Sequence, residues 1–401
     1  MTKKAMFLIL MGVLILSACK PAAEAVVLEG DRMPCSTVYD YETSAEVAQY
    51  QSVVDEQPPV TGEDWIYGNP DAPITIVEYE DFQCPACTSF SLGIKELINE
   101  YPDTIRVVFR HLPLPSIHDK AYLSSMAAEA AGAQGKFWEM HDFLYINQQE
   151  WTGMTEDAFV DWTLSRAEEL ELDTTQFEQD LYDESKRAEL EATTEQRLAN
   201  GMNYTPFVVV NDRIWRNNTP NLYGLIGIYE FDGFEECPPW VIDVDRDYLA
   251  RLDTSAGEIN IKLYSADAPL AVNSFVFLAQ NGWFDEVYFH RVIDGFVAQA
   301  GDPSGLGVVG PGYSFENETD NELSFDRAGI LGMANAGADS NGSQFFITLA
   351  PATDLDGGYT IFGEVAEDSL GVLDDIARRN PQSAADFEDA TIINGIEIIE
   401  E

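Results

Sequence analysis

The chain has 401 residues, of which 45% are hydrophobic, and its 22 basic and 70 acidic side chains give a formal net charge of -48. This length and apolar content predict two or three domains with substantial cores. Such an acidic surface repels phosphate groups, which argues against nucleic acid and acidic lipid head groups as partners. It is consistent with a solubilising surface, a saline habitat or an attraction to basic unfolded proteins.

Residues 1–18 are predicted to be a targeting segment. Two lysines precede an apolar run over residues 5–16, which is shorter than a membrane-spanning helix and typical of a signal sequence. The run ends in LSAC, which resembles a bacterial lipobox. The resemblance implies cleavage before Cys19, acyl chains on Cys19 and a lipid anchor in a bacterial membrane, outside the cytoplasm. An ordinary secretory signal is the alternative.

Residues 19–62 contain proline-rich pieces and are predicted to be a tether or linker. The next domain is predicted over residues 63–240. It begins with a β-rich run at 74–79, continues with the motif CPAC at 84–87, and reaches a second β-rich run at 105–109. Because helical spacing follows CPAC, these elements predict a strand, a helix and a parallel strand with a redox motif at the helix start.

The predicted position of CPAC gives its two thiols different roles. Cys84 precedes a helix whose free N–H groups favour a thiolate, and Pro85 suits the first helical position. We therefore expect Cys84 to attack a disulfide and Cys87 to resolve the intermediate. Glu78 is either a proton shuttle for Cys87 or a strand-end carboxylate in water. A permanent disulfide and half of a zinc site are the alternatives for the cysteine pair.

The segment resembles the DsbA-like branch of the thioredoxin fold. The likeness is carried by VEYEDFQCPAC (77–87), FRHLPL (109–114) and YTPFVV (204–209), with helical periodicity between the last two. It implies an α/β domain with a helical insertion, and a cis bond between Thr205 and Pro206 beside the cysteines as part of the client-binding surface.

Cys35 and Cys237 flank this domain. Four cysteines other than Cys19 permit three pairings, and assigning Cys84 and Cys87 to each other leaves a structural disulfide between Cys35 and Cys237. Such a bridge would join the linker to the far end of the domain, and chain-entropy reasoning limits its stabilisation to about 5 kcal/mol.

Residues 245–401 are predicted to form the last domain. An arginine, a phenyl ring and an amide occur at Arg291, Phe296 and Gln299 within an apolar run. A guanidinium on a buried strand face needs a partner or a substrate, because desolvating it alone is costly. The alternative is that Arg291 pairs with Asp294 or Glu286 and the aromatic residues are core.

Six segments of this domain occur in the order found in cyclophilins, the peptidyl-prolyl isomerase family. They are FHRVI (289–293), GD (301–302), GPGY (310–313), MAN (333–335), GSQFFI (342–347) and FGEV (362–365). The resemblance implies an all-β, eight-stranded barrel capped by helices. Arg291, Phe296 and Gln299 would then be catalytic, and the substrate-binding residues would be Met333, Ala334, Asn335, Gln344, Phe346, Leu355 and Tyr359.

Two positions depart from the family pattern. Asp354 replaces a tryptophan that many eukaryotic cyclophilins carry, and Tyr359 replaces a histidine. The first change implies weak binding of the family's cyclic-peptide drug and an altered pocket rim. Because neither residue carries out the bond rotation, we expect isomerase activity to survive.

Together these features predict an extracytoplasmic folding factor that isomerises X-Pro bonds and exchanges disulfides, which are both slow steps in folding. Its partners would be unfolded secreted proteins and a redox protein, and neither a cofactor nor a metal is expected. Two alternatives remain: a non-catalytic chaperone that holds clients, and a disulfide oxidoreductase that uses the barrel to dock substrates.

Overall fold

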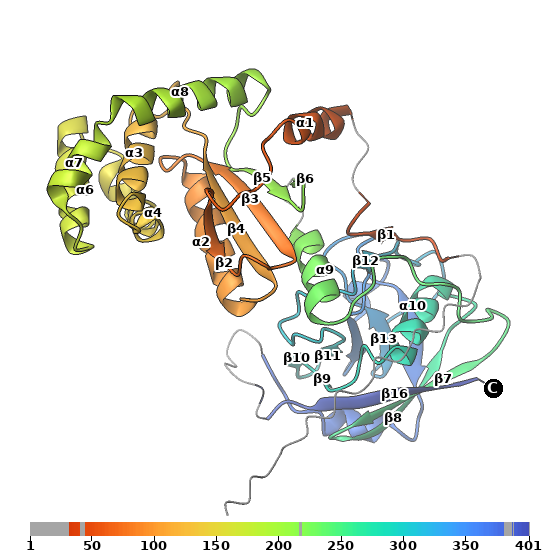
Figure 1. Ribbon diagram of the computed structural model, residues 1–401. Helices are drawn as coiled ribbons and strands as arrows, with labels where there is room; N and C mark the ends of the chain where they lie inside the picture. Colours follow the sequence, from red (N-terminus) through yellow and green to blue (C-terminus); the bar gives the residue numbers. More distant parts are fainter. Residues whose placement is uncertain (1–31, 41–44, 216–218, 381–386, 388, 401) are drawn as a thin grey trace, which may run out of the picture.

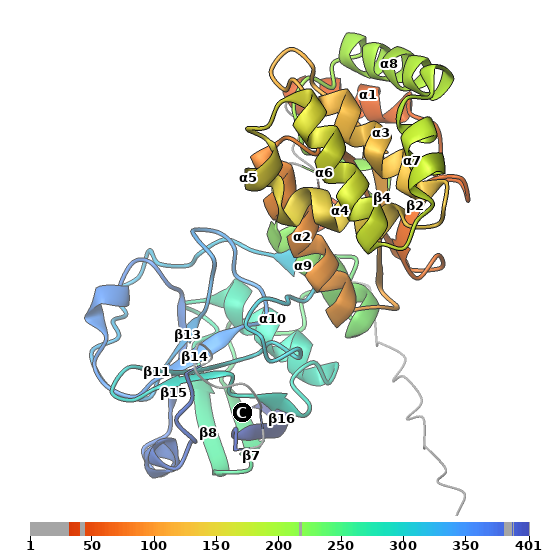
Figure 2. The same cartoon turned by 90° about the vertical axis from the view of Figure 1, so that its left-hand side faces the viewer.

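The computed structural model describes residues 32–40, 45–215, 219–380, 387 and 389–400. Figures 1 and 2 show two bodies, which we call the thiol domain (residues 45–230) and the C-terminal domain (residues 248–400). Within the described ranges, no helix has both the length and the apolar character needed to cross a membrane. Cys19 lies outside the described residues.

The thiol domain is built on a five-stranded sheet with the order β2-β4-β3-β5-β6. Its central pair, β3 and β4, is parallel, and parallel neighbours need a crossover that here is the helix α2 (Pro85–Glu100). The strands are β2 (Trp65–Gly68), β3 (Ile74–Glu80), β4 (Ile105–His111), β5 (Phe207–Val210) and β6 (Arg213–Trp215). The predicted order of strand, CPAC, helix and strand is confirmed.

Six helices lie between β4 and β5 and cover one end of this sheet (Figure 2). They are α3 (Ala121–Gly132), α4 (Phe137–Ile146), α5 (Gln148–Trp151), α6 (Glu156–Glu169), α7 (Thr174–Leu181) and α8 (Glu184–Ala199). The side chains of Thr155, Asp173 and Asp183 accept hydrogen bonds from the first turns of α6, α7 and α8. These caps satisfy backbone donors that would otherwise be unpaired.

The C-terminal domain is built on a nine-stranded sheet with the order β10-β11-β14-β13-β15-β8-β7-β16-β9. Its two edge strands are separated by only two residues of chain, so the sheet curls until its ends meet. The eight strands predicted become nine because one run is interrupted at Phe289 and His290. The strands are β7 (Tyr248–Thr254), β8 (Gly257–Leu263), β9 (Val287–Tyr288), β10 (Arg291–Ile293), β11 (Val297–Ala300), β13 (Ile330–Met333), β14 (Phe345–Thr348), β15 (Ile361–Val365) and β16 (Ile392–Glu400).

One long helix, α10 (Pro269–Gln280), packs into the curled sheet and is buried from Leu270 to Ala279. Glu318 caps its start by accepting hydrogen bonds from the backbone N–H groups of Leu270 and Ala271. A short strand, β12 (Tyr313–Ser314), and two 3-10 turns, η1 (Thr353–Leu355) and η2 (Leu370–Asp374), complete the domain.

Part of the segment assigned to a tether, residues 19–62, is folded. The strand β1 (Ser36–Thr37) pairs with β12, and the helix α1 (Ala45–Asp55) contacts β6. The predicted disulfide between Cys35 and Cys237 is present. The prediction of a tether rested on the proline-rich ends of this segment and was extended to the residues between them.

The two domains meet at the helix α9 (Thr219–Glu230). A Cβ at Gly224 would lie 2.4 Å from the side chain of Val38, and one at Gly227 would lie 1.9 Å from the carbonyl oxygen of Gly310. Val309, from the same C-terminal loop, is fully buried in an apolar cluster formed mostly by the thiol domain. The glycines therefore allow the helix to approach the loop backbone closely.

We predict that Gly227→Ala destabilises the protein by about 1 to 3 kcal/mol, because the methyl group overlaps backbone that cannot easily move. Gly93→Ala is the matched control, since Gly93 lies on α2 with nothing within 4 Å of an added Cβ. Removing a helical glycine there should stabilise by about 0.5 to 1 kcal/mol. Urea unfolding measures both changes, and equal effects of the two substitutions would contradict the interpretation.

Candidate active sites

The two free cysteines lie at the junction of β3 and α2. Cys84 occupies the N-cap position with no side-chain cap, and Pro85 is the first helical residue. The Sγ of Cys84 lies 3.5 Å from the carbonyl oxygen of Thr205, and the peptide bond between Thr205 and Pro206 is cis. The structure thus brings together the four residues that the sequence assigned to this site.

The two thiols differ in acidity, as their predicted roles require. A hydrogen bond from the Cys87 thiol is the largest cause that lowers the pKa of Cys84 to about 5, and backbone N–H groups of the helix start contribute. Burial raises the pKa of Cys87 above its ordinary value, and the hydrogen bond to Cys84 adds to this. Cys84 is therefore a thiolate at neutral pH while Cys87 stays protonated.

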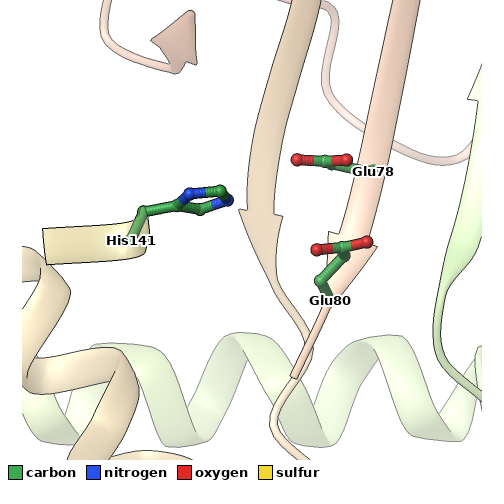
Figure 3. A group of neighbouring side chains, drawn as sticks. All are labelled: Glu78, Glu80 and His141. Carbon is green, nitrogen blue, oxygen red and sulfur yellow. The ribbon is translucent and has the colours of Figure 1, made fainter. Parts of the chain in front are cut away.

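Two carboxylates lie beneath the thiols. Glu78 and Glu80 on β3 are both 0% exposed, so the alternative of a strand-end carboxylate in water is wrong for Glu78. Figure 3 shows their carboxylates facing the ring of His141 on α4, and one ligand atom from each of the three residues lies within 4.8 Å of the others. Sequence reasoning missed Glu80, although residues two apart on a strand share a face.

The second candidate site is centred on an apolar cluster of the C-terminal domain, which we call the slot. Phe296 and Phe346 lie in one cluster, which also contains Val297, Phe325, Ile330, Ala334, Leu355, Tyr359 and Ile361. Phe346 packs against Phe325 and Tyr359 with ring centroids 5.3 and 5.7 Å apart. The predicted substrate-binding residues Ala334, Phe346, Leu355 and Tyr359 are therefore neighbours.

Arg291 lies beside this slot. Its guanidinium is 5.6 Å from the ring centroid of Phe296, and among the described residues it makes no ion pair or hydrogen bond. Asp294, which was its possible partner, instead pairs with Arg378 at 3.0 Å. Because an arginine without a partner keeps its donors free, Arg291 can donate to a bound ligand.

Amide side chains form the polar edge of the slot. Gln299 faces Arg291 across the pairing of β10 with β11, and its Nε2 donates to Oε1 of Gln344 at 2.9 Å. The Nδ2 of Asn335 donates to the carbonyl oxygen of Gly358 at 3.2 Å. All three amides, which were assigned to peptide binding, therefore surround the same region.

Met333 does not belong to the slot. Its side chain is 2% exposed and packs in the interior core of the curled sheet. Met333 shares this inward face with Leu331, two residues before it on β13, whereas Ile330 and Ala334 face the apolar cluster. Val297, which sequence reasoning did not select, occupies the apolar cluster instead.

A pocket of about 540 Å³ adjoins the polar edge and has walls from both domains. The C-terminal domain supplies Gln299, Asn335 and Gln344, while the segment preceding the thiol domain supplies residues 36–38 and α9 supplies Tyr223. The thiol domain therefore shapes the approach to the second site.

Two family models match the chain. One described as "Thioredoxin" covers residues 60–224, and one described as "Cyclophilin type peptidyl-prolyl cis-trans isomerase/CLD" covers residues 249–398. The peptidyl-prolyl cis-trans isomerase-like 1 of Emericella nidulans is 50% identical over 116 residues, which are 28% of this chain and 72% of that protein. The peptidyl-prolyl cis-trans isomerase CYP18-2 of Arabidopsis thaliana is 48% identical over 117 residues, 28% of this chain and 71% of that protein.

A crystal structure of a cyclophilin-type isomerase from Cryptosporidium parvum has a TM-score of 0.35 and 34% identity, covering 39% of this chain and 99% of that chain. The family matches define a two-domain protein with a thioredoxin-like domain followed by a cyclophilin-type domain. The chain belongs to the cyclophilin-type peptidyl-prolyl cis-trans isomerase family.

We predict that the reduced protein shows a thiolate transition with a midpoint near pH 5, because Cys84 ionises there. Absorbance at the thiolate band and the pH dependence of alkylation measure it. Cys87→Ala should move the midpoint upward, since it removes the largest cause of the lowered pKa. A midpoint near the ordinary thiol value in the unmodified protein would contradict the assignment.

Proposed function

We propose that the protein catalyses cis-trans isomerisation of X-Pro bonds in protein clients. The observation that carries this proposal is the half-buried Arg291 guanidinium, which has no protein partner among the described residues and lies 5.6 Å from the ring centroid of Phe296. The proline ring would enter the apolar slot, and the amides of Gln299, Asn335 and Gln344 would orient the peptide backbone.

The reaction requires only rotation about one bond. Amide resonance holds the X-Pro bond planar. Without a catalyst, the barrier to rotation about this bond is about 18 to 20 kcal/mol. In the twisted state the prolyl nitrogen regains a lone pair. A hydrogen bond from Arg291 to that nitrogen is stronger in the twisted state than in the planar one, and such differential binding lowers the barrier.

We predict that Arg291→Ala lowers kcat/KM on an Ala-Pro test peptide by about 100- to 1,000-fold, the effect typical of losing a transition-state donor. Arg327→Ala is the control, because Arg327 forms an exposed pair with Glu364 on the same domain. Client aggregation assays are run in parallel. Loss of turnover with intact suppression of aggregation supports catalysis by Arg291, and full turnover in Arg291→Ala would contradict that role. No turnover in the unmodified protein would leave the chaperone alternative.

We also propose that Cys84 and Cys87 exchange disulfides with clients or with a redox partner, in the manner of a DsbA-like enzyme. The support is the low pKa of Cys84 beside a protonated Cys87. Titration of the cysteine couple against glutathione determines whether the domain acts as an oxidant or a reductant. A pair that never equilibrates with glutathione would refute the proposal.

The clients in this proposal are unfolded secreted proteins, and the net charge of -48 favours basic ones. The 540 Å³ pocket beside Gln299 offers space for the client residues next to the proline. Because α9 and the segment around Ser36 form part of that pocket, the thiol domain would contribute to the choice of client.

We further propose that the protein works outside the cytoplasm, held by acyl chains on Cys19, as the sequence LSAC indicates. Cys19→Ser should move the protein from the membrane fraction to the soluble fraction of the cells that make it, because the lipid would be lost. Cys84→Ser is the control and should remain with the membranes. Membrane retention of Cys19→Ser would contradict the anchor.

A further inference from the structure

Two acidic side chains share the interior of the thiol domain without enough partners for two charges. One oxygen of each, Oε2 of Glu78 and Oε1 of Glu80, is buried with no hydrogen-bond partner among the described residues. Tyr145 donates to the other oxygen of Glu80 at 2.6 Å. Because like charges in an apolar interior cannot both persist, this pair holds at least one proton.

A continuous path of hydrogen bonds leads from Glu78 to the surface. The Oγ of Ser91 lies 3.2 Å from Oε1 of Glu78 and 3.0 Å from Nε2 of His141. The Nδ1 of His141 lies 2.9 Å from Oδ1 of Asp142. Ser91 is 1% exposed and His141 is 0% exposed, whereas the Asp142 side chain is 35% exposed. Each step is within hydrogen-bond distance.

The charged groups around the path favour its use by a proton. Burial lowers the pKa of His141 to about 4, so the ring is neutral and can accept on one nitrogen while donating from the other. Lys95 on α2 donates to both Asp142 oxygens at 2.6 Å. The charge of His111 on β4 is a further, smaller cause that lowers the pKa of His141. Burial raises the pKa of Glu78 to about 8, within reach of a proton donor near neutrality.

We propose that Ser91, His141 and Asp142 form a proton relay that connects the Glu78 and Glu80 pair with solvent during thiol-disulfide exchange at Cys87. Ser91 and His141 are positioning residues, because they act through Glu78. This inference rests on the proposed redox function and adds a proton path to it.

In a mixed disulfide, the thiol of Cys87 loses its proton to a carboxylate of the pair, and the resulting thiolate attacks the sulfur of Cys84. The bond between Cys84 and the client breaks, the bond between Cys84 and Cys87 forms, and the client leaves as a thiolate with the electron pair. The relay then passes one proton from the pair through Ser91 and His141 to Asp142, which releases it to water. Opening of the disulfide runs the same path inward.

The test follows oxidation of the reduced full chain by glutathione disulfide, with acid quenching and mass spectrometry to resolve the mixed disulfide from the final disulfide. In His141→Gln, the glutamine amide can still form hydrogen bonds, but it cannot relay a proton as the imidazole does. We expect the second phase to slow by about 10- to 100-fold at pH 7, as for loss of acid-base assistance. The pH profile of Cys84 alkylation should not change.

His111→Gln is the matched control, since His111 is also buried but pairs with Glu129 at 2.9 Å, off the path. It should leave both phases unchanged. A second phase in His141→Gln equal to that of the unmodified protein, at every pH tested, would overturn the relay. Stoichiometric divalent metal in the purified protein would also overturn it, because the carboxylates would then hold a cation. If the unmodified protein shows no first phase, the redox function itself fails.

Discussion

A charge that is removed from water must find a partner, and this constraint shapes both sites of the protein. In the C-terminal domain, Arg291 has an aromatic ring beside it but no acid among the described residues, so its donors are available to the ligand that we propose. In the thiol domain, Glu78 and Glu80 have no cation in contact among the described residues, and burial raises the pKa of both, so the pair holds at least one proton. Arg291 therefore keeps its charge and can donate hydrogen bonds, whereas the Glu78 and Glu80 pair loses charge by binding a proton.

Much of this arrangement could be predicted from the sequence, because it follows from local rules. A strand followed by CPAC and a helix defines the position of Cys84, and the spacing of Arg291, Phe296 and Gln299 defines the edge of the slot. What failed were features set by distant contacts. Met333 shares the inward face of β13 with Leu331, and because all four residues of this strand are buried, the curled sheet rather than the local sequence decides which face turns inward.

The folded part of the presumed tether is a second failure of the same kind. Residues 36–37 form a strand only because β12 offers an open edge more than 270 residues later in the chain. Glu80, by contrast, was within reach of sequence reasoning, since its spacing from Glu78 placed both on one face of a strand. His141 was not, because it reaches the pair from a helix that folds over the sheet.

The helix α2 runs from the thiols at its N-terminus toward the junction with the C-terminal domain, where Tyr101, directly after the helix, lies near Ser304. At about 1.5 Å per residue, its 16 residues set the thiols roughly 24 Å from that junction. Val309 crosses the same junction and completes an apolar core that belongs mostly to the other half. The thiol domain therefore does not complete its apolar interior alone, and cutting it free of its neighbour would expose hydrophobic surface to water.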